Sequence, residues 1–172
     1  GVKLLNIDPG KATNRTVITF VGPPETIVDA AYSLISKAKE LIDMRSHKGE
    51  HPRMGAVDVC PFIPISGVSM KETVDLAHQL GKRVGSELLI PVYCYENAAK
   101  NNLRVNLANC RSGEYEGLKN KLRDVKWKPD YGPNKFNETV AKFGAVAIGA
   151  RDFLVAYNIN LNTTSTRRAN SV

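Results

Sequence analysis

Short apolar runs alternate along this 172-residue sequence with two long stretches whose apolar residues recur at helical spacing. The first stretch runs from Pro24 to Ile42, and the second begins at Ser69 and continues to Leu88. Ser69 and Glu72 match a capping box, in which two side chains satisfy free backbone N–H groups in the first turn of a helix. Both stretches are therefore expected to form helices that cover one face of a sheet.

The runs around these helices are rich in β-branched and aromatic residues and are bounded by turn residues. Predicted strands cover residues 2–7, 16–21, 56–65, 90–95, 145–150 and 153–160. Pro61 and Pro64 restrict the second half of the third run to a sheet edge or to irregular extended backbone, since proline cannot donate to a ladder. With a hairpin expected near each end, this order predicts an α+β fold: a two-layer α/β sandwich of the split βαβ type with a mixed or antiparallel sheet.

Several residues refine this layout. Gly81 and Gly85 lie near the apolar stripe of the second helix, and their cost to the helix indicates a close approach of this helix to the sheet. In the strand at 90–95 the two tyrosines fall on one face, whereas Val92 and Cys94 fall on the other. These faces are expected to contact different parts of the molecule.

Two segments are predicted to connect secondary-structure elements. Asp8, Pro9 and Gly10 are turn residues and are expected to end the first strand. Residues 126–144 mix aromatic, basic and turn residues, with 137–139 as an apparent insertion. A loop of this length inside a compact domain is usually functional or disordered.

Composition narrows the class of protein. The chain is 42% hydrophobic and 24% charged, which suits one globular core, and its net charge of +7 raises nucleic acid as a partner. The basic residues are spread along the chain and the aromatic residues do not interleave with them, so a nucleic-acid-binding module is a weak alternative. No apolar run approaches the roughly 20 residues that span a bilayer, and no export leader is visible, so we expect a cytoplasmic protein without membrane contact.

The cysteine and histidine patterns give no metal site. Cys60, Cys94 and Cys110 are odd in number and widely spaced, as expected for reduced thiols in or near a core. His47 and His51 would align on a helix, but glycine and proline between and after them argue against one, and no third ligand is adjacent. We therefore expect no bound metal.

The segment from His47 to Gly55 carries two imidazoles, three further charges and two glycines directly after a predicted helix. A solvated loop needs neither two histidines nor the proline that stiffens the backbone after His51. We interpret His51 as a proton-transferring residue at the mouth of an α/β sheet. His47 is expected to be a hydrogen-bonding neighbour rather than a second catalytic group.

Nearly the whole chain resembles the N-terminal subdomain of the glutamate formiminotransferase family. The matching segments are 8–16, 20–24, 41–44, 47–55, 58–64, 113–116, 127–133, 149–151 and 158–161. The resemblance implies a ferredoxin-like subdomain that pairs with a second, similar one, with folate in the groove between them. It also implies transfer of a formimino group from N-formimino-L-glutamate to N5 of tetrahydrofolate, a late step in histidine degradation.

The resemblance also implies site residues. The histidine at the position of His51 is the catalytic residue of this family, and the aspartate at the position of Asp8 is expected to assist it. The segment from Gly132 to Gly144 is expected to contact tetrahydrofolate. Within that segment the expected contacts are Gly132, Pro133, Asn134, Lys135, Phe136 and Gly144.

The implied chemistry agrees with these residue types. Attack of an amine on an amidine carbon, followed by loss of glutamate, requires one group to take a proton and return one, and an imidazole does both near neutral pH. A carboxylate such as Asp8 would orient the imidazole or hold the cationic amidine. Arg15, Lys48 and Arg53 are candidates for the carboxylates of N-formiminoglutamate and of folate or its polyglutamate tail.

Residues 1–172 are interpreted as one subdomain, a fragment that lacks the opening strand and helix and the C-terminal subdomain. A fragment retains His51 while losing part of its substrate groove, so a non-catalytic folate-binding or partner-binding subdomain is the alternative function. Loss of the covering segments exposes apolar surface, so we also expect homo-oligomers.

Overall fold

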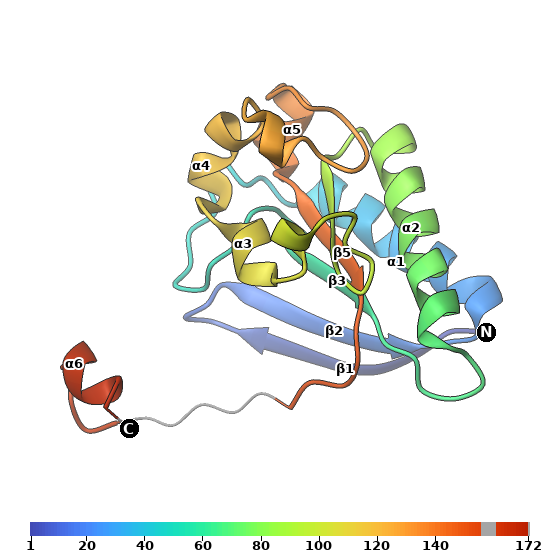
Figure 1. The fold of residues 1–172 in the computed structure, drawn as a ribbon, viewed down its shortest axis with the longest axis horizontal. Helices are drawn as coiled ribbons and strands as arrows, with labels where there is room; N and C mark the ends of the chain where they lie inside the picture. Colours follow the sequence, from blue (N-terminus) through green and yellow to red (C-terminus); the bar gives the residue numbers. More distant parts are fainter. Residues whose placement is uncertain (156–160, 172) are drawn as a thin grey trace.

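Two sheets and two long helices form the body of the chain (Figure 1). The computed structural model describes residues 1–155 and 161–171. The main elements are β1 (Lys3–Gly10), β2 (Arg15–Val21), α1 (Pro24–Leu41), β3 (Val59–Phe62), α2 (Met70–Glu87), β4 (Val92–Glu96) and β5 (Val146–Ala150). Between β4 and β5 lie η1 (Asn102–Arg104), α3 (Leu107–Arg111), α4 (Glu114–Lys121), η2 (Val125–Trp127) and α5 (Glu138–Phe143), and α6 (Thr166–Ala169) follows β5.

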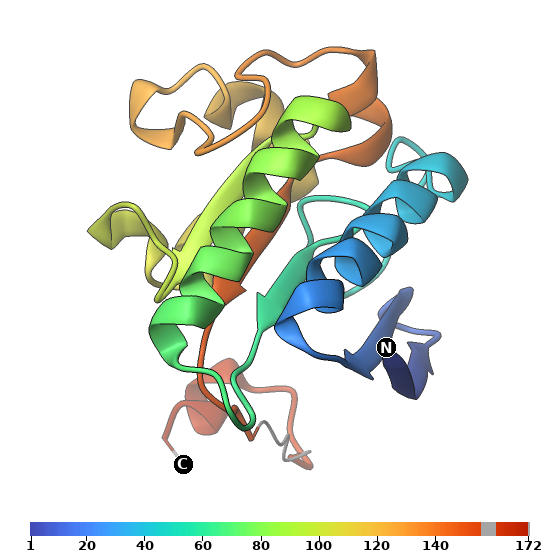
Figure 2. The same cartoon turned by 90° about the vertical axis from the view of Figure 1, so that its right-hand side faces the viewer.

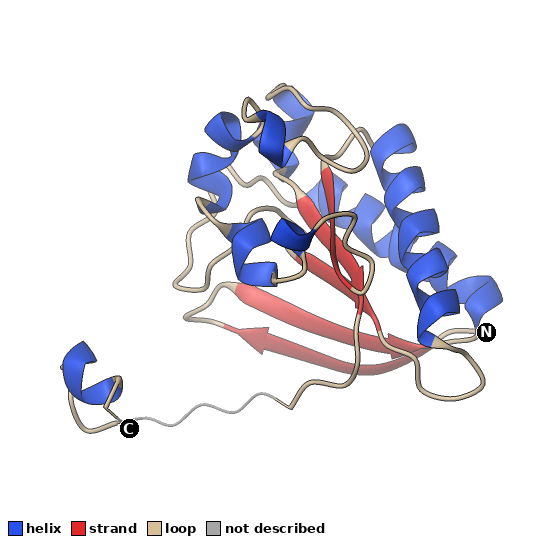
Figure 3. Cartoon of the chain, viewed as in Figure 1, coloured by secondary structure: helices blue, strands red, loops and turns tan. Residues whose placement is uncertain are grey.

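The sheets differ in the direction of their strands (Figure 3). β1 and β2 form an antiparallel hairpin, whereas β3, β5 and β4 form a parallel sheet in that order. The unit β3–α2–β4 therefore has β5 inserted between its strands, which confirms the split βαβ arrangement. The predicted two-layer α/β sandwich is also confirmed, and the antiparallel pairing that the sequence predicted is found in the hairpin.

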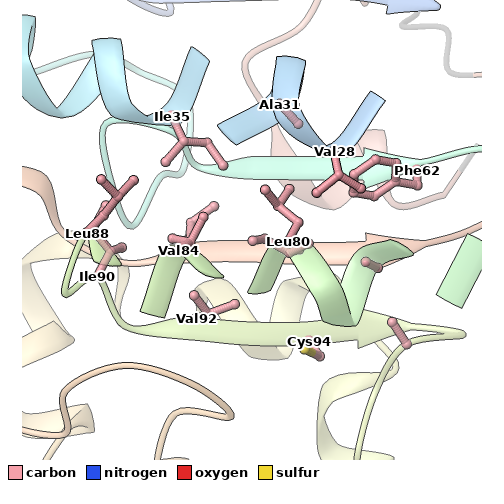
Figure 4. Close-up of a cluster of buried hydrophobic side chains, with 14 of the residues drawn as sticks. Val28, Ala31, Ile35, Phe62, Leu80, Val84, Leu88, Ile90, Val92 and Cys94 are labelled. Carbon is pink, nitrogen blue, oxygen red and sulfur yellow. The ribbon is translucent and has the colours of Figure 1, made fainter. Parts of the chain in front are cut away.

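The helices α1 and α2 lie side by side on one face of the parallel sheet (Figure 2). Side chains of both helices meet alternate residues of the strands in an apolar core that includes Ile35, Leu80, Val92 and Cys94 (Figure 4). The capping box that opens α2 is present, since the Glu72 N–H donates to Ser69 Oγ at 3.2 Å. Both predicted helices are therefore confirmed.

The opposite face of the parallel sheet is covered in part by α3, α4 and η2. Tyr93 and Tyr95 point into this second cluster with Leu118, whereas Val92 and Cys94 point toward α2. The division of faces predicted for this strand is confirmed. Burial raises the pKa of the Cys94 thiol to about 12, and the three cysteines are free within the described part of the chain.

The first predicted turn is wrong. Asp8, Pro9 and Gly10 continue β1, and the chain reverses at residues 11–14 instead. Pro9 is compatible with β1 because, among the described strands, β1 pairs only with β2 and is therefore an edge strand, where proline is found. Asn14 supplies the reversal with a left-handed φ of 47°, a conformation that asparagine accepts more readily than most residues.

The segment predicted as one long loop contains a helix. Residues 137–139, which look like an insertion, open α5, because Asn137 Oδ1 accepts a hydrogen bond from the Val140 N–H at 2.9 Å. Beyond β5, residues 151–155 are irregular, and the remainder of the strand predicted for 153–160 lies outside the described residues. No helix in the described ranges is long and apolar enough to span a bilayer.

The hairpin exposes apolar side chains. Ile7 is 55% exposed and Ile18 is 41% exposed, and Leu4, Leu5 and Val17 are exposed as well. Ile7 and Ile18 lie opposite each other on one face of the hairpin, whereas Val17 lies on the other face. A two-stranded ribbon with exposed apolar residues is marginally stable by itself, so we expect it to contact further protein.

Gly85 of α2 is closely packed, but against residues 131–132, which lie between η2 and α5, rather than against the sheet as predicted from the sequence. A Cβ atom at Gly85 would lie 2.5 Å from Gly132 N and 2.7 Å from Tyr131 Cβ. We therefore expect Gly85→Ala to lower the free energy of unfolding by about 1–3 kcal/mol, because backbone must move to admit the methyl group.

The matched control is Gly117, which lies inside α4, where an added Cβ atom would meet no other part of the described chain within 4 Å. Gly117→Ala is expected to raise the free energy of unfolding by up to about 1 kcal/mol through helix propensity alone. Urea denaturation of the two variants measures both effects. Equal effects in the two variants would contradict the close packing of Gly85.

Candidate functional site

The loop at residues 45–53 is anchored by a buried methionine at each end. Met44 N donates to Lys142 O at 2.7 Å, and Met54 O accepts from Ala145 N at 2.9 Å. Met54 N also donates to Asp58 Oδ1 at 2.9 Å. Both ends of the loop are therefore fixed to the core, at the side of the parallel sheet where its strands begin.

The middle of this loop docks on the tip of the hairpin. Asn14 Nδ2 donates to Lys48 O at 2.7 Å, and Glu50 N donates to Ala12 O at 3.3 Å. Gly49 permits the contact, because a Cβ atom there would lie 2.3 Å from Thr13 O. The sequence did not predict that the hairpin turn supports this loop.

His51 is half-buried, and one nitrogen of its ring is held by the adjacent backbone. Its Nδ1 lies 2.7 Å from Pro52 O. Since a carbonyl oxygen only accepts hydrogen bonds, Nδ1 carries a proton in this arrangement, and in the neutral ring Nε2 carries the lone pair. Within the described residues Nε2 has no hydrogen-bond partner, so it is free to accept a proton from a bound molecule.

His47 has the opposite arrangement. Its Nε2 lies 2.9 Å from Asn14 O and must donate to it, which leaves Nδ1 to accept from Arg53 Nε at 3.5 Å. Both nitrogens of His47 are thus used within the protein. The expectation that His47 is a hydrogen-bonding neighbour of the site agrees with this geometry.

A surface cavity of about 500 Å³ lies beside the loop. Its lining combines cations of the loop with carboxylates from the start of α4, namely Lys48, Gly49, Arg53, Gly113, Glu114 and Glu116. Arg53 pairs with Glu116 through Nη2 at 2.7 Å and with Glu114 through Nη1 at 3.1 Å. Its side chain is only 12% exposed.

The ion pair between Arg53 and Glu116 shifts the pKa of both side chains. The hydrogen bonds to Glu116 raise the pKa of Arg53, and the same bonds lower the pKa of Glu116 below its usual value. Glu114 and Glu116 were absent from the candidate residues chosen from the sequence. Their separation of more than sixty residues hides the pairing with Arg53, although segment 113–116 is among those that resemble the family.

Asp8 and Arg15 lie on the hairpin rather than in the cavity. Asp8 pairs with Val17, and Gly10 pairs with Arg15, in the register of β1 and β2. Since opposite residues and residues two apart share a face, Asp8 and Arg15 lie on one face of the hairpin at diagonal positions that an arginine side chain can bridge. Both are exposed, and no contact of either with His51 is found in the described residues.

The segment expected to contact folate is divided between two places. Gly132 lies against Ile90 O and the backbone of α2, and residues 134–136 after it are exposed. Gly144, at the other end of the segment, forms a bridge with Gly55 directly after the loop that carries His51. Of the candidate residues, therefore, Lys48 and Arg53 line the cavity, and Gly144 lies near the loop.

No group of three or more metal-binding side chains is assembled within residues 1–155 and 161–171. The loop instead offers the His51 imidazole with a held proton, whereas the cavity beside it is lined by Lys48, Arg53 and two carboxylates, and His51 is not among its lining residues. Such a set can move a proton and bind a charged small molecule without a metal.

Comparison with known sequences identifies similar proteins. Residues 1–151 match the family described as the formiminotransferase domain, N-terminal subdomain. The chain is 51% identical over 166 residues to a glutamate formimidoyltransferase of Thermoplasma acidophilum, covering 95% of this chain and 54% of the relative. It is 46% identical over 163 residues to the glutamate formimidoyltransferase of Streptococcus pyogenes, with the same coverage of 95% and 54%.

A longer relative shows the same match. The chain is 54% identical over 164 residues to the formimidoyltransferase-cyclodeaminase of Rattus norvegicus, covering 95% of this chain and 30% of the relative. The chain thus spans about half the length of the two shorter relatives and about three tenths of the longer one.

Proposed function

Since the chain belongs to the formiminotransferase family, as the N-terminal subdomain of the formiminotransferase domain, we propose that it is the His51-bearing part of a glutamate formimidoyltransferase. The proposed reaction transfers the formimino group of N-formimino-L-glutamate to N5 of tetrahydrofolate, as in histidine degradation, without a metal. The names of the relatives support the transferase class. The substrates are part of the proposal.

The observation that carries the proposal is the state of the His51 ring. With Nδ1–H bound to Pro52 O, the lone pair of Nε2 is available to take the proton of an attacking amine. The protonated imidazole can return that proton to the departing glutamate nitrogen. One residue thus serves both halves of the transfer, and the Pro52 carbonyl stabilises the ring orientation throughout.

The cations have distinct proposed roles. Lys48 is exposed at the cavity and has no carboxylate partner within the described part of the chain, so its ammonium is available to a substrate carboxylate. Arg15, on the same hairpin face as Asp8, is proposed to bind a second carboxylate. Asp8 is proposed to hold the cationic amidine or to orient His51 once substrate is bound. Arg53 already pairs with two glutamates, so a direct role with substrate is less well supported than the sequence predicted.

The folate site is proposed to need additional protein. Gly144 lies next to the end of the loop, and residues 134–136 are exposed, so they are accessible to a ligand. On this basis we propose that Gly132, Pro133, Asn134, Lys135, Phe136 and Gly144 contact tetrahydrofolate in a groove. The exposed apolar hairpin supports packing against a further subdomain. We propose that a C-terminal subdomain closes this groove.

The test is an assay of the full-length protein that contains this sequence. With N-formimino-L-glutamate and tetrahydrofolate, we expect consumption of the first and appearance of the 5-formimino product. Titration of the 172-residue chain with tetrahydrofolate, followed by Trp127 fluorescence, measures binding separately. Binding without any transfer by the full-length protein would favour the non-catalytic folate-binding alternative and contradict the proposal.

A further inference from the structure

Arg53 contacts both ends of the segment that carries His51. Its guanidinium donates to His47 O through Nη2 at 3.3 Å, while its own backbone oxygen accepts from Tyr115 N at 2.9 Å. The segment 47–53 is therefore closed on itself by one side chain and joined to α4 by one backbone hydrogen bond. His51 lies inside this closed segment.

Glu116, on α4, forms a bidentate ion pair with Arg53. Glu116 Oε2 lies 2.8 Å from Nη1 and Oε1 lies 2.7 Å from Nη2. A bidentate pair of this kind fixes orientation as well as distance, because the planar guanidinium matches the two carboxylate oxygens. Glu114 adds a third contact at 3.1 Å.

The backbone before α4 is held in an uncommon conformation where it meets Arg53. Gly113 has φ 82° and Glu114, a residue with a side chain, has φ 52°. A left-handed conformation at a non-glycine residue is unfavourable and persists where surrounding contacts determine it. The contacts here are those of Arg53 with the two glutamates.

From this geometry we propose that Arg53 and Glu116 are positioning residues that hold the 47–53 segment, and with it the His51 ring, in the orientation required for transfer. The role in transfer rests on the proposed function. The contacts that restrain residues 47–53 do not depend on it. Neither residue needs to touch the substrate. Arg53 is thereby reassigned from substrate binding to orientation of the catalytic loop.

The first arm of the test does not require activity. Hydrogen exchange is followed by mass spectrometry in the full-length protein, for peptides covering residues 45–55. Glu116→Gln keeps the size of the side chain but weakens the pair, and it is expected to accelerate exchange in these peptides by about tenfold through local opening. Glu40→Gln is the matched control, because Glu40 forms an exposed pair with Lys37 within α1 and makes no contact with Arg53 or α4.

The second arm measures coupling to His51 in the formimino transfer assay. Glu116→Gln and Arg53→Lys are expected to lower kcat by roughly 10- to 100-fold, since small displacements of a catalytic group are costly. In a His51→Gln background the same substitutions should have little further effect, because residues acting through one group are not additive. Glu116→Asp, which retains the charge, should recover part of the rate.

The outcomes distinguish the positioning role of Arg53 and Glu116 from the proposed transferase function. Unchanged exchange at residues 45–55 in Glu116→Gln would overturn the positioning role. Full additivity with His51→Gln would also overturn it, because a residue acting elsewhere in the protein lowers the rate independently. Accelerated exchange in Glu116→Gln, together with a wild-type protein that transfers no formimino group, would overturn the proposed function while supporting the restraint on the segment.

Discussion

His51→Gln is expected to slow formimino transfer by the full-length protein by about 10²- to 10⁴-fold, the usual contribution of a general acid–base residue. Glutamine retains a donor that can reach Pro52 O but has no lone pair able to carry a proton between two nitrogens. The loss should therefore appear in kcat, measured at saturating concentrations of both substrates. Folding should be unaffected, because the His51 ring is half-buried and only one nitrogen is bound.

Two other histidines serve as comparisons. His78→Gln should leave the rate unchanged, because His78 lies on α2 and contacts Tyr131 rather than the loop. His47→Gln should have an intermediate effect, since His47 supports the loop through Asn14 and Arg53. A fall of less than about tenfold for His51→Gln would contradict its role in proton transfer.

Asp130→Ala is expected to lower the free energy of unfolding of the 172-residue chain by about 3–5 kcal/mol, because it leaves a buried charge without its partner. Asp130 pairs with Arg104, and the two side chains are 5% and 4% exposed. Asp130 Oδ2 also accepts from Cys94 N at 2.7 Å. The substitution thus removes an ion pair and the side-chain acceptor of a backbone N–H of β4.

Urea denaturation measures this loss, and an exposed pair provides the matched control. Asp29 pairs with Arg83 on the surface of α1 and α2, and Asp29→Ala is expected to cost only about 0–1 kcal/mol. The double variant Asp130→Leu with Arg104→Met should recover much of the stability, since neither charge then remains. If Asp130→Ala lowers the free energy of unfolding as little as Asp29→Ala does, the buried pair does not contribute strongly to stability.

Features encoded by neighbouring residues could be predicted from the sequence. The Ser69–Glu72 box and Pro24 located the starts of the two helices, because capping depends on residues within one turn. The alternating faces of Tyr93 and Val92 followed from the geometry of a strand. Such patterns need no knowledge of distant contacts.

Features that depend on distant partners could not be predicted. Asp8, Pro9 and Gly10 have turn composition, but pairing with β2 keeps them extended. Residues 137–139 looked like loop, whereas the cap at Asn137 and the buried Val140 and Phe143 make a helix. Local composition is a weak guide where tertiary contacts decide between two conformations.

The candidate site also combines features that local sequence predicts with features that depend on distant contacts. The sequence identified the loop and favoured His51 over His47, but only the structure shows why their rings differ, since carbonyls from separate elements fix opposite tautomers. Arg53 was expected to bind substrate because a guanidinium can bind a substrate carboxylate through two hydrogen bonds. Its carboxylate partners come from α4, far along the chain.

The contact between the hairpin tip and the loop has a mechanical consequence. Ala12 and Asn14 hold residues on either side of Gly49, while the strands that carry this tip present bare apolar surface. We therefore expect a protein that binds to those strands to change the position or mobility of the tip, and through two hydrogen bonds that of the loop that carries His51.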